Sequence, residues 1–215
     1  MRITPRLLSA LALLLAIHLP AQAAKDANAD LYDAVAPADS AFVRVLNLSD
    51  KGIDVTLSGK VNPQKVPAGQ IGGYRFVPQG KHRIATGTLA VEPELKANTA
   101  TTLLYTGSEL IVIADAFVNE PKKAQVAFYN LTGQDVALKT RDGKHDIVQA
   151  LGKNQTGSRM VNEIKIGFAA YAGEQSLAQF DELFLKKGRS YSYVLLPQAG
   201  GYRTLSLANS VDPTE

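Results

Sequence analysis

Residues 40–57 read SAFVRVLNLSDKGIDVTL, and this stretch decides how the rest of the chain is interpreted. An alternating apolar run is followed by Asn-Leu-Ser, a polar turn and a second alternating run. A period of two is typical of strands that lie half buried against a core. The stretch therefore predicts a hairpin whose residues Val43, Val45, Val55 and Leu57 face inward.

A related stretch follows later, because residues 124–138 read AQVAFYNLTGQDVAL. Aligning Asn47 with Asn130 superimposes the apolar positions and the Asp-Val pairs, and the turn of the second copy is shorter. A strand pattern, a polar turn and a second strand pattern thus occur twice in the same order. The repeat predicts two related domains.

A second pair of segments supports the repeat. Residues 95–99 (LKANT) and 185–189 (LKKGR) each precede a strand pattern, and Asn98 and Gly188 suit the left-handed backbone of a turn. Between the matching landmarks the second copy is several residues longer. We expect the extra residues within 152–161 or 172–180.

The first residues are typical of a secretory signal. Arg2 and Arg6 precede an apolar run at 7–17, and Ala21-Gln22-Ala23 presents small residues to a signal peptidase. The run is shorter than the roughly 20 residues that a membrane helix needs. We expect residues 1–23 to be removed and the mature chain to be exported without a transmembrane segment.

Charge and cysteine content exclude several classes of protein. The chain has 23 Lys and Arg against 20 Asp and Glu, and no cysteine. Without Arg2 and Arg6 it is nearly neutral, which is a poor argument for binding a polyanion. The lack of cysteine excludes thiol catalysis, thiolate metal sites and disulfides, so stability must come from hydrophobic cores.

The pattern after the signal divides into four parts. Residues 24–39 are rich in Ala and Asp without a period and predict an extended leader, and residues 119–123 are a polar linker with a proline. Residues 40–118 and 124–215 are short strands and turns without a convincing amphipathic helix. This predicts an all-β chain of two tandem antiparallel β-sandwich domains, Ig-like or carbohydrate-binding-module-like.

Residue patterns for catalysis or metal binding are sparse. His82 and His145 are the histidines after the signal, and neither has a second histidine at ligand spacing. Asp142, His145 and Asp146 are candidates for a polar cluster, but a solvated Asp-Gly hairpin turn explains them better. No nucleophile elbow or phosphate-binding glycine loop appears. We expect no catalytic, cofactor or metal site.

A carbohydrate site is a further alternative. The candidate cations for a polyanion patch are Lys122, Lys123, Lys186, Lys187 and Arg189. Tyr191, Tyr193 and Tyr202 are candidates for stacking on sugar rings. Alternation places Tyr191 and Tyr193 on one strand face, which is also the pattern of core residues.

Two groups of segments carry a family resemblance. Leu31-Tyr32, residues 36–37 (AP) and residues 40–45 (SAFVRV) come first, and residues 138–146 (LKTRDGKHD) follow in the second domain. These segments closely resemble the AlgF family of alginate biosynthesis proteins, and the resemblance runs over most of the mature chain. It implies a periplasmic accessory protein that O-acetylation of alginate requires, with the acetyl-transfer chemistry in partner proteins.

The residues and the resemblance together favour a non-catalytic adaptor. We expect it to bring together acetyltransferase proteins of the periplasm and inner membrane, without a cofactor and without nucleic acid. The first alternative is a module that binds alginate and presents it for acetylation. The second is a hydrolase or transferase that uses Asp142 or His145.

Partner contacts are expected on the leader and the first strand. The candidates are Leu31, Tyr32, Pro37 and an exposed Arg44. Arg44 lies on the strand face opposite Val43. An arginine there equally suits a side chain that lies along the sheet or pairs with Asp54.

Overall fold

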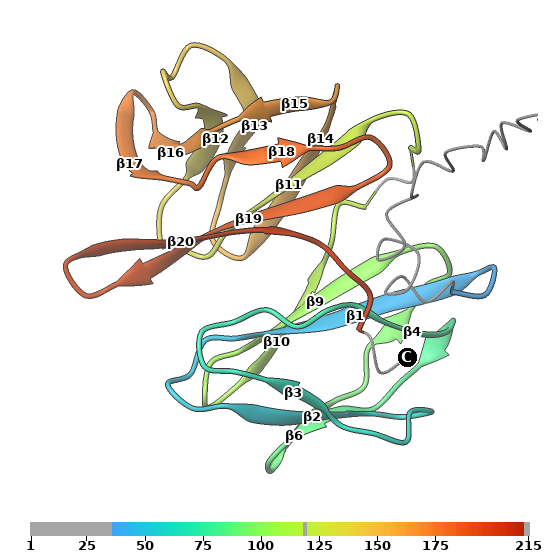
Figure 1. The fold of residues 1–215 in the computed structure, drawn as a ribbon. Helices are drawn as coiled ribbons and strands as arrows, with labels where there is room; N and C mark the ends of the chain where they lie inside the picture. The colour runs from blue at the N-terminus through green and yellow to red at the C-terminus, as the bar shows by residue number, and fades with distance from the viewer. Residues whose placement is uncertain (1–35, 118–119, 213–215) are drawn as a thin grey trace, which may run out of the picture.

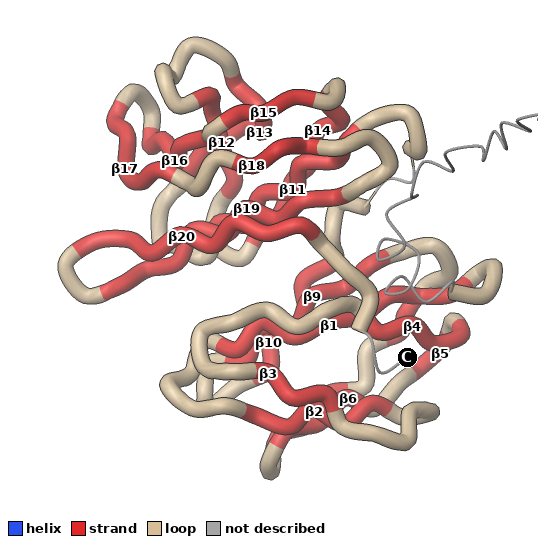
Figure 2. The backbone as a smooth tube through the Cα atoms, in the orientation of Figure 1, coloured by secondary structure: helices blue, strands red, loops and turns tan. Residues whose placement is uncertain are grey.

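The computed structural model describes residues 36–117 and 120–212, and every regular element in them is a β-strand (Figures 1 and 2). The expected signal at 1–23, most of the leader, and the candidates Leu31 and Tyr32 lie outside the described residues. Within the described ranges no helix is long and apolar enough to cross a membrane.

The first domain is a sandwich of two four-stranded sheets. One sheet has the order β10-β9-β1-β4, with bounds Leu110–Ala114, Ala100–Tyr105, Ser40–Asn47 and Arg75–Pro78. The facing sheet has the order β3-β2-β6-β7, with bounds Gln64–Val66, Ile53–Leu57, Ile84–Thr86 and Leu89–Val91. A short pair, β5 (Gly80–Lys81) and β8 (Glu94–Leu95), completes the domain.

The second domain repeats this arrangement. Its first sheet has the order β14-β11-β19-β20, with bounds Gln155–Val161, Ala124–Asn130, Ser190–Gln198 and Gly201–Ala208. The facing sheet is β13-β12-β16-β17, with bounds Asp146–Leu151, Val136–Thr140, Phe168–Ala172 and Gln175–Gln179. The short pair is β15 (Ile164–Ile166) with β18 (Leu183–Leu185).

The repeat predicted from the sequence is confirmed strand by strand. Each strand of the first domain has a counterpart numbered ten higher, and the counterparts have the same neighbours in their sheets. Even the parallel pairing of β1 with β9 recurs as the parallel pairing of β11 with β19. The two domains therefore share one topology of ten strands.

Two details of the sequence prediction are wrong. β1 and β2 do not form a hairpin, because β1 pairs with β4 and β9 in one sheet and β2 pairs with β3 and β6 in the other. The turn between them carries the chain across the sandwich. The sheets are also not purely antiparallel, since β1–β9 and β11–β19 are parallel.

A buried asparagine holds this crossing turn in each domain. Asn47 Oδ1 accepts hydrogen bonds from the amide and hydroxyl of Ser49, and its Nδ2 donates to the Lys51 and Val66 carbonyls. Asn130 repeats the arrangement, since it accepts from the amide and hydroxyl of Thr132 and donates to two carbonyls. Buried backbone groups need such partners, so the aligned asparagines are structural.

The extra residues of the second domain lie mainly elsewhere than expected. The first expected range, residues 152–161, does not contain the insertion, because most of these residues form β14, which is the counterpart of β4. One insertion lengthens the β12–β13 hairpin, where Val136 pairs with Leu151 while the equivalent Val55 pairs with Gln64. In the other expected range, 172–180, β17 (Gln175–Gln179) is longer than its counterpart β7 (Leu89–Val91), and Phe180 after it lies in the core.

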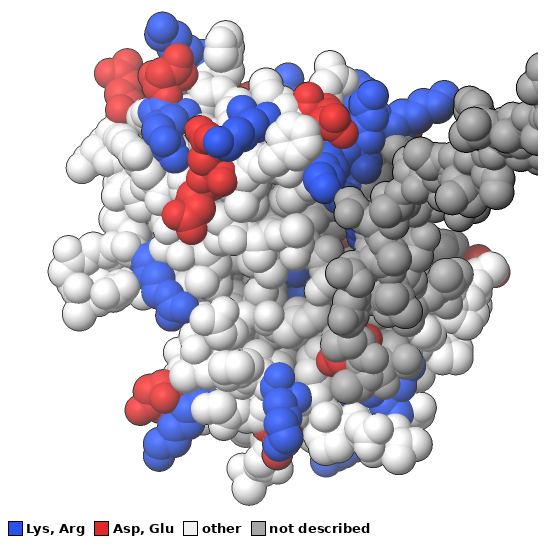
Figure 3. Space-filling view, viewed as in Figure 1, with Lys and Arg blue, Asp and Glu red and all other residues white. Residues whose placement is uncertain are grey.

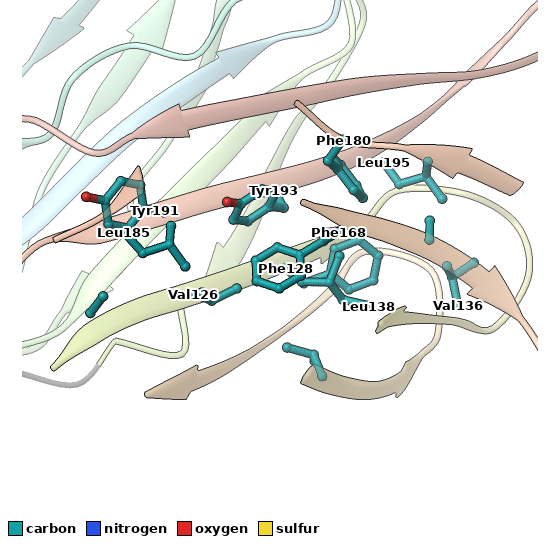
Figure 4. Close-up of a cluster of buried hydrophobic side chains, with 13 residues drawn as sticks. Val126, Phe128, Val136, Leu138, Phe168, Phe180, Leu185, Tyr191, Tyr193 and Leu195 are labelled. Atoms are coloured by element: carbon teal, nitrogen blue, oxygen red, sulfur yellow. The ribbon is translucent and has the colours of Figure 1, made fainter. Parts of the chain in front are cut away.

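Each sandwich encloses its own apolar core. The inward residues predicted from the first stretch, Val43, Val45, Val55 and Leu57, are all buried in the core of the first domain. In the second domain Phe128, Phe168, Phe180 and Tyr193 meet edge to face (Figure 4). Tyr191 and Tyr193 are 4% and 0% exposed, so their shared strand face is a core face, and the alternative that they stack on sugar rings is wrong.

The two core tyrosines are expected to respond in opposite ways to loss of the hydroxyl. Tyr191 Oη accepts from the Lys186 amide at 2.8 Å and donates to the Phe184 carbonyl at 3.0 Å. Tyr193 Oη is buried and has no hydrogen-bond partner among the described residues. Because an unsatisfied buried hydroxyl is costly, Tyr193→Phe should raise the free energy of unfolding by about 1 kcal/mol, and Tyr191→Phe should lower it by about 1–2 kcal/mol. Urea unfolding at neutral pH measures both, and equal losses in the two variants would contradict this assignment.

Candidate interaction site at the domain junction

The two domains pack face to face through the outer surfaces of their β1- and β11-containing sheets (Figure 1). Both strands are therefore covered on both sides, unlike a strand with one solvent face. The apolar residues of this junction are Leu46, Leu104, Ile113, Ala127, Tyr129, Leu131, Val194 and Leu196. Burial of this set stabilises one fixed arrangement of the domains.

Arg44 lies at the centre of the junction and is only 2% exposed. Its Nε donates to Thr102 Oγ1 at 3.0 Å within the first domain. Its other nitrogens cross the junction and donate to three side chains of the second domain, Tyr129 Oη at 2.9 Å, Ser192 Oγ at 2.9 Å and Asn209 Oδ1 at 2.7 Å. One buried cation thus hydrogen-bonds both domains.

The charge of Arg44 is compensated by aromatic rings and one nearby carboxylate. The guanidinium lies 4.2 Å from the centre of the Tyr74 ring, and Asp115 Oδ2 accepts from Tyr74 Oη and Thr102 Oγ1. Burial disfavours the charged form, but Tyr129, Tyr74 and Asp115 raise the pKa of Arg44 above its ordinary value. Burial also raises the pKa of Tyr74, and the Arg44 charge opposes this. The cluster consists of a charged arginine surrounded by neutral tyrosines.

The prediction that Arg44 is exposed and free for a partner is wrong. The face opposite Val43 is not a solvent face, because the second domain covers it. Nor does Arg44 pair with Asp54, whose carboxylate lies 3.0 Å from Lys65 Nζ. The missed signal was the run of apolar residues on both faces of the two strands, which is typical of strands buried on both sides.

The end of the chain returns to the first domain. After β20 the segment runs back to β4 (Figure 1), where Tyr74 and Val211 form a parallel bridge. The Tyr74 amide donates to the Ser210 carbonyl and the Asp212 amide donates to the Tyr74 carbonyl, both at 2.8 Å. Residues 210–212 thus add a backbone connection across the junction, although the sequence pattern predicts them as part of the second domain.

A cleft opens where the junction meets this returning segment. It has a volume of about 220 Å³ and takes Phe42, Tyr74 and Phe117 from the first domain. The second domain supplies its other wall, which includes Arg189 and Val211. A smaller hollow of about 110 Å³ adjoins it and shares Phe117 and Arg189 with it. We call the two hollows together the junction cleft.

The five cations singled out in the sequence gather beside the junction cleft. Lys122 and Lys123 are exposed and lie against the turn 186–189, because the Lys123 carbonyl accepts from the Gly188 amide at 2.9 Å. Lys186, Lys187 and Arg189 are exposed on that turn. In Figure 3, Lys and Arg side chains gather over the second domain at the right of the view. These five residues form the basic rim of the cleft.

Comparison with known proteins identifies the family. The family model described as "Alginate O-acetyl transferase AlgF" matches residues 12–192. The chain belongs to the AlgF family. The alginate biosynthesis protein AlgF of Pseudomonas fluorescens is 30% identical over 190 residues, which cover 87% of each chain. The protein of the same name from Pseudomonas aeruginosa is 29% identical and covers 83% of this chain and 82% of its own length.

Solved structures of AlgF domains are also similar to parts of this chain. The C-terminal domain of AlgF from P. aeruginosa matches with a TM-score of 0.38 and 27% identity, over 41% of this chain and 99% of that domain. The N-terminal domain matches with a TM-score of 0.33 and 24% identity, over 37% of this chain and 98% of that domain.

The remaining predicted site residues of this AlgF-family chain lie apart from the cleft and from one another. Tyr202 is at the start of β20, at the opposite end of β19 from the basic rim. Pro37 is exposed beside Phe76 and Pro78 in a separate hollow. The tyrosines therefore provide no sugar-stacking surface near the five cations.

The polar side chains Thr140 and Asp142 of the β12–β13 hairpin turn are hydrogen-bonded to each other and to backbone amides of the same turn. Asp142 accepts from the Thr140 hydroxyl at 2.6 Å and from the Lys144 amide at 3.2 Å, and these bonds lower the pKa of Asp142. The His145 amide donates to Thr140 Oγ1, and Gly143 has a positive φ of 73°. No group of three or more potential metal ligands occurs in residues 36–117 and 120–212.

Proposed function

We propose that this chain is a non-catalytic adaptor that acts in the periplasm during O-acetylation of alginate. It holds acetyltransferase components of the periplasm and inner membrane at a fixed distance from one another. Membership of the AlgF family and the names of its relatives support the alginate part of the proposal.

The observation that carries the adaptor role is the junction. Arg44 hydrogen-bonds both domains, an apolar cluster surrounds it, and residues 210–212 return to the first domain. Interfaces between domains of one chain are usually small and permit movement. A junction with a buried cation and a continuous apolar cluster instead fixes the position of one domain relative to the other. Surfaces on the two domains then stay at a constant distance, as an adaptor between two proteins requires.

The matching family model is described as an acetyl transferase, which raises the alternative that this chain itself transfers the acetyl group. Acyl transfer needs a nucleophile activated by a neighbouring base. Ser58 Oγ lies 3.3 Å from His82 Nδ1, but it also accepts from the Arg83 amide at 3.0 Å. His82 Nε2 lies 2.8 Å from the Pro78 carbonyl. These bonds hold neighbouring turns, and we assign the pair a structural role.

The adaptor proposal is tested by calorimetry of the mature protein with each purified acetyltransferase component. We expect binding to at least two of them at the same time, because a ternary complex is what an adaptor forms. We also expect Ser58→Ala and His145→Ala to retain both binding and alginate acetylation in cells. Absence of binding to any component, or loss of acetylation in either variant with folding and binding intact, would contradict the proposal.

Direct binding of alginate is the second candidate, and the gathered basic rim favours it. Affinity electrophoresis with alginate distinguishes the two functions. An alginate-binding module would be retarded, and the retardation would weaken with salt and with Lys186→Ala plus Lys187→Ala. An adaptor that contacts only proteins would migrate equally with and without the polymer.

A further inference from the structure

The floor of the junction cleft is apolar and of the size of one side chain. Phe42, Tyr74, Phe117 and Val211 line it. Its volume of about 220 Å³ is below the roughly 300–1,000 Å³ typical of small-molecule sites. The hollow therefore suits a single aromatic or branched apolar group better than a whole small ligand.

The rim of the same cleft is positively charged. The five cations of the rim stand beside two carboxylates, Glu120, which lines the smaller hollow, and Glu163, which accepts from the Lys187 amide. The surplus is positive, so the complementary ligand is acidic. Long, exposed lysines adapt to different positions of a negative charge and accelerate association with an acidic partner.

We propose that the junction cleft binds an extended acidic segment of a partner protein, which places one apolar anchor side chain against Phe42 and Phe117. This proposal rests on the adaptor function and specifies its surface. Alginate has the negative charge but no apolar side chain, and of the tyrosines considered for sugar stacking Tyr191 and Tyr193 are in the core and Tyr202 lies at the far end of β19. The charge and shape of the cleft together favour a peptide over the polysaccharide.

Both domains contribute to the proposed site. Phe42, Tyr74 and Phe117 come from the first domain, whereas Arg189 and Val211 come from the second. Neither domain alone forms the hollow. Binding of the segment therefore depends on the domain arrangement that the Arg44 cluster maintains.

Photo-cross-linking identifies what occupies the cleft. Phe117 is 38% exposed and lines both hollows, so Phe117→p-benzoylphenylalanine places the probe at the anchor position. The control carries the same replacement at Tyr202, which is 36% exposed at the start of β20. In cells that acetylate alginate, we expect the Phe117 probe to cross-link to a segment of an acetyltransferase component that is acidic and contains an apolar side chain. We expect the control probe not to do so. Links to alginate, to residues 24–35 of the same chain, or in equal amounts from both positions would overturn the proposal.

A charge reversal separates this proposal from the adaptor function. The ligand is a synthetic peptide of the cross-linked segment, and its affinity for the mature chain is measured by fluorescence anisotropy. Lys123→Glu with Lys187→Glu should weaken binding by about tenfold or more and reduce its salt dependence. Lys144→Glu with Lys153→Glu, in the same domain but outside the rim, should leave it unchanged. If the rim variant binds the intact component as well as the wild type does, the cleft is not the binding surface, but the adaptor function is retained. If the wild type binds no acetyltransferase component, the adaptor function itself is contradicted.

Discussion

Replacing Arg44 by methionine is expected to lower the free energy of unfolding by about 3–5 kcal/mol, the range for breaking a buried charged pair. Methionine retains much of the apolar length but leaves Tyr129, Ser192 and Asn209 without their donor across the junction. It also removes the cation that offsets the nearby Asp115 carboxylate. Urea unfolding followed by fluorescence measures the loss, and we expect two resolved transitions in place of one because the domains lose their connection.

The matched control is Arg83→Met. Arg83 lies on the surface of the same domain, 3.5 Å from Glu92, and exposed ion pairs contribute at most about 1 kcal/mol. Tyr129→Phe removes one acceptor of Arg44 and should cost about 1 kcal/mol. A loss in Arg44→Met no larger than in Arg83→Met would mean that the apolar cluster alone holds the domains together.

The second large effect is expected from the paired asparagines. Asn130→Ala leaves the buried Thr132 amide without its acceptor and removes the Asn130 donor from the Gln134 and Leu151 carbonyls, of which the first keeps the Thr132 hydroxyl. Each unsatisfied buried group costs about 1–3 kcal/mol, so we expect a loss of about 2–3 kcal/mol. Asn47→Ala should cost about as much, because its network is equivalent.

Thermal and urea unfolding of the two single variants check this equivalence. Asn62→Ala is the control, since Asn62 is exposed and its hydrogen bond among the described residues is made by the backbone carbonyl, which accepts from Arg75 Nη1. It should change stability by less than about 0.5 kcal/mol. If Asn47→Ala and Asn130→Ala resembled this control, the aligned asparagines would not be the structural centre of the repeat.

The sequence predicted the fold where the signal was local and periodic. The alternation around Val43 and Val126 identified inward residues, and the aligned asparagines identified the repeat. Asn98 and Gly188 do have the positive φ expected of them, at 57° and 71°. These features depend on a few adjacent residues, which a single sequence displays directly.

The candidate site was less accessible to sequence reasoning because it is made by packing between domains. The alternation that placed Arg44 opposite Val43 was correct, but it does not indicate whether solvent or another sheet lies on that side. Phe42, Phe117 and Val211 are far apart in the chain and meet only at the junction. The two segments that carry the five cations precede β11 and β19, and because these strands pair in parallel the segments lie side by side, whereas Tyr202 lies at the other end of β19.

The shared topology of the two domains has a consequence for symmetry. Both domains use the same outer face at the junction, which is the arrangement of a two-fold dimer of identical subunits. In such a dimer each position occurs twice, and an arginine at this place would bring a second buried cation to the contact. Within one chain the copies have diverged, and Arg44 aligns with Ala127. Tyr129, which aligns with Leu46, accepts a hydrogen bond from Arg44. Covalent linkage of the copies thus allows one charged side chain at a contact where a symmetric pair would carry two.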